Sequence, residues 1–117
     1  MDEIAFKSRT KRFALQIIAF AELLPRTMSA QVIGKQLLRS GTSVGSNYRA
    51  ACRAKSTDDM KAKLGIVEEE ADESLYWLEL FEEAKLIDKS TMRSLSQEGT
   101  EILAMTVASI KTLRSRI

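Results

Sequence analysis

The stretch MKAKLGIVEEEADESLYWLELF, residues 60–81, carries the pattern that decides the fold. Small or apolar side chains recur in it every three or four residues, which is the spacing of one face of an α-helix. The positions are Met60, Leu64, Val67, Ala71, Ser74, Leu78 and Phe81. A heptad seam of this kind predicts a long amphipathic helix that packs against other helices.

The same period continues on both sides of this stretch. A segment over residues 4–24 ends at Pro25, and a second begins near Ser29, which we expect to be its N-cap. The 60–81 pattern begins at Ser56 or Thr57, either of which can cap a helix. A fourth stripe consists of Met92, Leu95, Ile102, Thr106, Ser109 and Leu113. Four helices of about 20 to 30 residues with short connections predict an all-α fold, an antiparallel up-down four-helix bundle.

Length and composition limit the class of protein. The 117 residues suffice for one hydrophobic core, so we expect a single four-helix-bundle domain over residues 1–117. A lone Cys52 cannot form an internal disulfide, which favours a reducing compartment. The acidic start is unlike a signal peptide, and no apolar run reaches the roughly 20 residues of a membrane span. We expect a cytoplasmic protein that does not contact a membrane.

Two short motifs resemble catalytic or metal sites. Residues 41–45, GTSVG, match the G-x-S-x-G turn of hydrolases, but that turn follows a strand and needs a histidine. Glu70 and Glu73 have the i, i+3 spacing of carboxylate metal sites in bundles, which also use histidine. The sequence has no histidine, the usual general base and metal ligand. We therefore expect no enzyme activity, no catalytic residue, no metal site and no cofactor.

Charge is divided between neighbouring segments. Residues 28–57 hold five bases and no acid, whereas residues 58–84 hold ten acids and two lysines. The five bases are Lys35, Arg39, Arg49, Arg53 and Lys55. At 100° per residue, the first four fall within about 40° of one line, opposite the apolar face. We call these four the basic stripe.

The basic stripe has three interpretations at this stage. It spans 18 residues, roughly 27 Å along a helix, and is long enough to follow a phosphate backbone, so we assign nucleic-acid binding to it and to Lys55. Its bases could instead form salt bridges with the acids of residues 58–84, within one subunit or between subunits. It could also be plain solvated surface.

Small and polar residues line the inner side of the basic segment. We expect Ser40, Gly41 and Val44 to face the core, where small side chains let a neighbouring backbone come close. Asn47 lies beside this face, and a half-buried amide needs partners. We predict a structural role in which Asn47 bonds across the bundle, with Glu70 as a candidate partner, and fixes the register of the helices.

The 60–81 segment is also apolar away from its seam. Tyr76 and Leu80 lie nearly opposite the seam, and Trp77 lies to one side. A helix that is apolar all round is buried from more than one direction. We therefore predict that these three residues form a subunit interface.

Two stretches, QLLRSGTSVGSNYRAACRAKS and DDMKAKLGIVEEEADESLYWLELF, resemble the 23S rRNA-intervening-sequence proteins, also called the four-helix bundle protein family. The similarity covers about residues 13–113. The residues that carry it are Arg39, Ser40, Ser43, Asn47, Ser56, Lys63, Glu70, Tyr76, Trp77 and Leu78. Many relatives have an acid where this chain has Ala50, so this chain is more basic there than the family pattern.

The resemblance implies a bundle that assembles into a ring-like homopentamer and has no established catalytic activity. Some members are encoded inside intervening sequences of 23S rRNA genes. A related branch comprises the accessory proteins of diversity-generating retroelements, which bind a reverse transcriptase and nucleic acid through a basic surface. We therefore expect an oligomeric, non-enzymatic bundle that binds RNA or DNA through its basic stripe. The alternative is a protein-interaction scaffold or accessory subunit whose charged faces serve assembly only.

Overall fold

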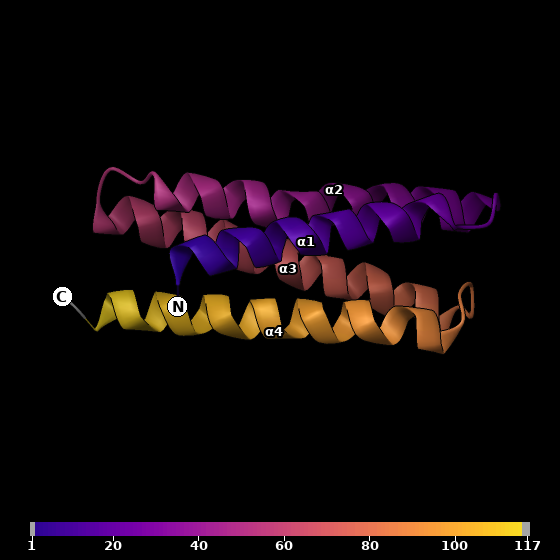
Figure 1. The fold of residues 1–117 in the computed structure, drawn as a ribbon. Helices are drawn as coiled ribbons and strands as arrows, with labels where there is room; N and C mark the ends of the chain where they lie inside the picture. Colours follow the sequence, from indigo (N-terminus) through magenta and orange to yellow (C-terminus); the bar gives the residue numbers. More distant parts are fainter. Residues whose placement is uncertain (1, 116–117) are drawn as a thin grey trace.

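The computed structural model describes residues 2–115, which form four α-helices in chain order. These are α1 (Glu3–Glu22), α2 (Met28–Cys52), α3 (Thr57–Glu83) and α4 (Lys89–Arg114). Successive helices run in opposite directions, so the start of α1, the α2–α3 connection and the end of α4 lie at one end of the bundle (Figure 1). The molecule is a rod of 49 × 20 × 19 Å. The predicted antiparallel up-down bundle is confirmed.

Short polar side chains cap the first three helices. The Asp2 carboxylate accepts the Ile4 amide at 3.0 Å, and Ser56 Oγ accepts the Asp59 amide at 3.1 Å. The expected cap at Ser56 is therefore correct. For α2 the prediction is wrong, because Thr27 and not Ser29 is the N-cap. The Thr27 hydroxyl accepts the Ala30 amide, which places Ser29 inside the first turn.

The predicted seam of α3 forms the centre of the core. Leu64, Val67, Ala71, Ser74, Leu78 and Phe81 are all buried, whereas Met60 at the end of the seam is half-buried. Aromatic rings fill the space between helices near each end of the bundle. Phe6 packs edge-to-face on Tyr48 with ring centroids 4.7 Å apart, and Phe20 packs on Phe81 at 5.5 Å.

Helix α2 approaches its neighbours closely through its small residues. Ser40, Gly41 and Val44 are buried, as the sequence predicts. A Cβ atom at position 41 would lie 2.9 Å from Ile17 Cγ1 of α1. On the side of α3, the buried hydroxyls of Ser40 and Ser74 are hydrogen-bonded at 3.0 Å. The small side chains therefore set the distances from α2 to both neighbours.

A polar clamp joins α1 to α4. The Arg9 guanidinium makes a two-pronged contact with Glu98, at 2.7 and 2.9 Å, and reaches Glu101 at 3.2 Å. The hydrogen bonds from Arg9 hold the pKa of the Glu98 carboxyl below its usual value, against the opposing effect of burial.

Within residues 2–115, no helix is both long enough and apolar enough to span a membrane.

We predict opposite effects for two glycine-to-alanine substitutions. Gly65→Ala should raise the free energy of unfolding by about 1 kcal/mol, because alanine favours helix and nothing lies within 4 Å of the added Cβ. Gly41→Ala gains the same helix preference but forces its methyl group against the branched Ile17 side chain. Overpacking of this kind costs about 1–3 kcal/mol, so this variant should be less stable than the wild type. Urea denaturation measures both, and equal stabilisation would contradict the close approach at Gly41.

Candidate nucleic-acid interface

The basic stripe lies on the outer surface of α2. Lys35, Arg39, Arg49 and Arg53 are all exposed, whereas Leu37, Val44 and Tyr48 on the opposite side are buried. Lys55 is exposed in the connection from α2 to α3. The orientation predicted from helical spacing is therefore correct.

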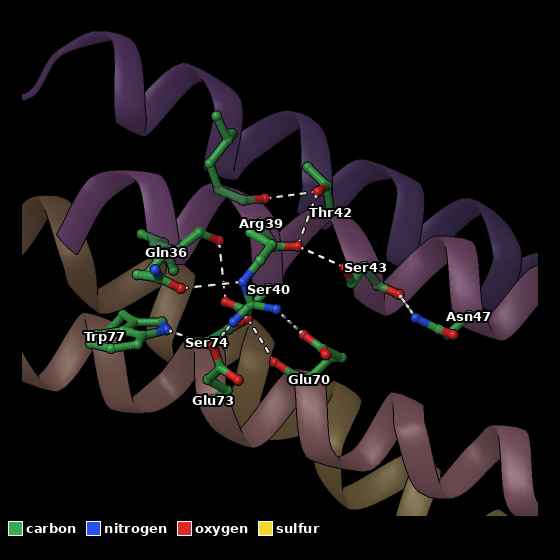
Figure 2. A network of polar contacts seen from close by, with 12 residues as sticks. Gln36, Arg39, Ser40, Thr42, Ser43, Asn47, Glu70, Glu73, Ser74 and Trp77 are labelled. Carbon is green, nitrogen blue, oxygen red and sulfur yellow. Dashed lines mark hydrogen bonds and ion pairs between the residues drawn. The ribbon is translucent and has the colours of Figure 1, made fainter. Parts of the chain in front are cut away.

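Arg39 differs from the rest of the stripe because it is bound to acids of α3. Its guanidinium forms ion pairs with Glu73 and, at 3.4 Å, with Glu70 (Figure 2). Gln36 accepts a hydrogen bond from Arg39 Nε at 3.2 Å, and Trp77 Nε1 donates to Glu73 at 3.0 Å. Arg39 therefore joins α2 to α3, and the stripe is not one continuous free surface.

Asn47 does not bond to Glu70, so the prediction of its partner is wrong. Asn47 Nδ2 donates to the backbone carbonyl of Ser43, one turn earlier on α2, at 2.9 Å (Figure 2). The carboxylate of Glu70, the expected partner, is held by Arg39. A charged donor binds a carboxylate more strongly than a neutral amide does, and the carbonyl of Ser43 is within reach of the amide. The buried polar contact between α2 and α3 is the Ser40–Ser74 hydrogen bond.

The remaining stripe residues and Lys55 carry free positive charge. The side chains of Lys35, Arg49, Arg53 and Lys55 make no ion pair with any residue between 2 and 115. Among the four, Arg49 and Arg53 stand one turn apart near the end of α2. A free guanidinium presents several N–H donors in a planar fork that matches the oxygens of a phosphate.

A shallow groove of about 420 Å³ lies beside these two arginines. It is lined by Ser46, Arg49, Ala50, Arg53 and Lys63. Ser46 and Ala50 are small, so the floor of the groove stays open between the long basic side chains. An acid at position 50 would place a negative charge in this groove.

Lys63 of α3 is a member of this groove that the sequence reasoning missed, because it was counted with the acidic segment. Its ammonium contacts the Asp59 carboxylate at 2.6 Å, and the Lys55 amide donates to the same carboxylate at 3.1 Å. Both hydrogen bonds lower the pKa of Asp59, and the one from Lys63 has the larger effect. The acid nearest the groove is therefore already bound.

The three residues predicted to form a subunit interface lie on one part of α3. Tyr76 is 51% exposed and packs its ring against Trp77 at 5.1 Å. Trp77 and Leu80 are half-buried. Tyr76 thus presents a large, partly uncovered aromatic surface, and the role of the three residues in assembly stays a prediction.

The two glutamates with metal-site spacing do not converge on an ion site. Glu70 and Glu73 both contact Arg39. Over residues 2–115, no group of three or more cysteine, aspartate and glutamate side chains is placed to hold a metal ion.

Fold and surface together define a small all-α bundle with a basic groove between two of its helices. The model of the 23S rRNA-intervening sequence protein family matches residues 2–108, and the chain belongs to this family. The fold is also similar to the crystal structure of a protein of unknown function from the S23 ribosomal protein family of Bacteroides thetaiotaomicron VPI-5482. The two chains are 36% identical with a TM-score of 0.88, over 95% of this chain and 99% of the other. A comparison with curated proteins gives no match.

Proposed function

We propose that this protein is a non-enzymatic, oligomeric bundle that binds the phosphate backbone of RNA or DNA through α2. Arg49 and Arg53 are the principal contacts, with Lys55 and Lys35 beside them. The observation that carries the proposal is that neither guanidinium group forms an ion pair with residues 2–115, while both line an open groove. The third base of this groove, Lys63, is already paired with Asp59. Cationic side chains of this kind bind phosphate and release its counterions.

The acids of α3 do not compensate these two arginines. Glu70 and Glu73 are bound to Arg39, and Asp59 is bound to Lys63. The structure therefore favours the salt-bridge interpretation for Arg39 and leaves phosphate binding open for Arg49 and Arg53. This division supports the proposal more specifically than the net charge of +2, which conceals it.

Binding of this kind should be independent of base sequence. Tyr48 is the aromatic residue nearest the two arginines along α2, and it is buried against Phe6. Base stacking on single strands uses exposed aromatic rings, and base readout uses side chains that enter a groove of the duplex. The free cations support contact with the backbone only.

A second candidate is a scaffold or accessory subunit, for example of a reverse transcriptase, whose charged faces serve assembly. The exposed ring of Tyr76 beside Trp77 favours this candidate. In both cases we propose that the chain forms a homo-oligomer, with a pentamer favoured by the family resemblance. We also propose a cytoplasmic location, which suits the single free thiol of Cys52.

The proposed assembly predicts a mass near five times the 13.1 kDa of one chain. Light scattering after size exclusion measures it, and a monomer at micromolar concentration would contradict the proposal. Leu80→Asp should weaken assembly, because it places a charge in the expected interface. Leu95→Ala is the control: Leu95 is 6% exposed, and its loss should act through a core cavity costing about 2–5 kcal/mol.

The proposed phosphate contact predicts a loss of affinity when both arginines are removed. Arg49→Ala/Arg53→Ala should weaken binding to every RNA and DNA sequence alike, and should flatten the dependence of affinity on salt. Fluorescence anisotropy with a labelled RNA duplex and a labelled DNA duplex, from about 50 to 200 mM salt, measures both effects.

Arg26→Ala/Arg93→Ala is the matched control, since it removes two exposed arginines, also without an ion pair in residues 2–115, from the other end of the bundle. The control should bind like the wild type. If the wild-type protein binds neither duplex at low salt, or if the arginine variant binds as well as the wild type, the second candidate replaces the first.

A further inference from the structure

Two lysines of α1 lie beside the basic half of α2. Phe6 packs on Tyr48, and a Cβ atom at Gly45 would lie 3.5 Å from the backbone carbonyl of Thr10. The N-terminal half of α1 therefore runs along the C-terminal half of α2. Lys7, half-buried, and Lys11, exposed, belong to this part of α1.

Helical spacing places Lys7 at the border of α1 with α2, and Lys11 between this border and the outer surface. Ala21 contributes to a hollow together with Gly34 and Leu38 of α2, so this side of α1 faces α2. Lys7 is two heptads before Ala21, which at 100° per residue places it about 40° from Ala21 around α1, toward the outer surface. Lys7 is also close to the Cys52 thiol of α2, where burial raises the pKa of Cys52 and the Lys7 charge acts in the opposite direction.

Arg49 and Arg53 lie on the outer surface of α2, between its border with α1 and the groove that they share with Lys63 of α3. Gly45 faces Thr10 of α1, and Arg49 follows Gly45 by one turn. At 100° per residue, a side chain four residues further along α2 lies about 40° further around the helix, toward the outer surface. The same step separates Lys11 from Lys7 on α1. The four cations Lys7, Lys11, Arg49 and Arg53 thus flank the seam between the two helices, and we call them the seam patch.

The seam patch is free of internal ion pairs. None of its four side chains forms a salt bridge with a residue of the described range 2–115. Two acids lie at its edge: Glu3, which lies beside Cys52, and Asp2, which caps α1.

Charge along the whole rod also favours this end. Residues 2–12, 45–67 and 104–115, which lie toward the end with the α2–α3 connection, hold eleven lysines and arginines against four acids (Figure 1). Residues 13–44 and 68–103, toward the other end, hold six lysines and arginines against twelve acids. A polyanion is therefore attracted to the end that carries the seam patch and repelled by the other.

We propose that the seam patch is one phosphate-binding surface across α1 and α2 and that its partner is a nucleic-acid duplex. This inference rests on the proposed function and extends it to residues outside α2. The patch provides positive charge but no exposed aromatic ring on which a base could stack. The aromatic residues of the two helices are all buried: Phe6, Phe13, Phe20 and Tyr48. Single-strand binding gains about 1–3 kcal/mol per base from stacking on aromatic rings. A duplex instead offers twice the phosphate density, one charge per roughly 1.7 Å of its axis.

Lys7→Ala/Lys11→Ala tests the extension to α1. If all four cations contact phosphate, they should contribute about −3.6 to the slope of log K against log salt on a duplex and about −2.8 on a single strand. The lysine variant should flatten the duplex slope by about 1.8 and weaken binding at least about tenfold at 100 mM salt, and we expect the same of Arg49→Ala/Arg53→Ala. Arg26→Ala/Arg93→Ala is again the control and should change neither quantity. The ligands are an RNA duplex, a DNA duplex and the corresponding single strands of equal nucleotide length.

The outcomes separate this inference from the proposed function. The lysine variant could keep the affinity and salt slope of the wild type while the arginine variant loses affinity. That result would overturn the seam patch and leave the proposed function intact. Equal wild-type affinity for duplex and single strand would overturn the assignment of the partner. A changed oligomer mass in the lysine variant would assign Lys7 and Lys11 to assembly and overturn the inference. No binding by the wild type at about 50 mM salt would overturn both proposals.

Discussion

The close approach of α2 to its neighbours is the constraint on which the rest of the structure depends. Gly41 allows the α2 backbone to lie against Ile17 of α1, and the Ser40–Ser74 hydrogen bond holds the opposite side against α3. Larger side chains at these positions would push both neighbours away. Because the inner face is thin, the Arg39 side chain can reach α3, and α1 lies near enough to α2 for their basic residues to share one surface.

The polar groups of the bundle then divide into two sets. One set is paired inside the bundle: Arg39 with two glutamates of α3 and Arg9 with Glu98 of α4 join helices, and Lys63 pairs with Asp59 within α3. The other set consists of cations without an ion pair in residues 2–115, among them Lys7, Lys11, Arg49 and Arg53. Surface ion pairs of the first kind contribute about 0–1 kcal/mol each, so they guide the alignment of helices more than they stabilise them. The second set leaves charge available to a partner.

The helices, their order and their inner faces could be predicted from the sequence, because a 3.6-residue period is local information. The same periodicity placed Lys35, Arg39, Arg49 and Arg53 on the outer face of α2. It could not show that Arg39 is paired and Arg49 is free, because the period fixes an angle about one axis and not the height of one helix against another. The partner of Asn47 was wrong for this reason. Lys7 was overlooked because its distance from Cys52 depends on how α1 is aligned along α2.

The central claim is that Arg39 stabilises the contact between α2 and α3, whereas Arg49 binds phosphate. Arg39→Ala and Arg49→Ala remove the same group from one helix, so their comparison in two assays, urea denaturation and anisotropy with a labelled duplex, tests the claim most directly. The account predicts that Arg39→Ala lowers the free energy of unfolding by about 1 kcal/mol and keeps duplex affinity within about twofold of the wild type, on the grounds that its charge is already compensated. Arg49→Ala should change stability by less than about 0.5 kcal/mol and weaken binding by more than Arg39→Ala does. Equal losses of affinity in the two variants would contradict the division between paired and free arginines.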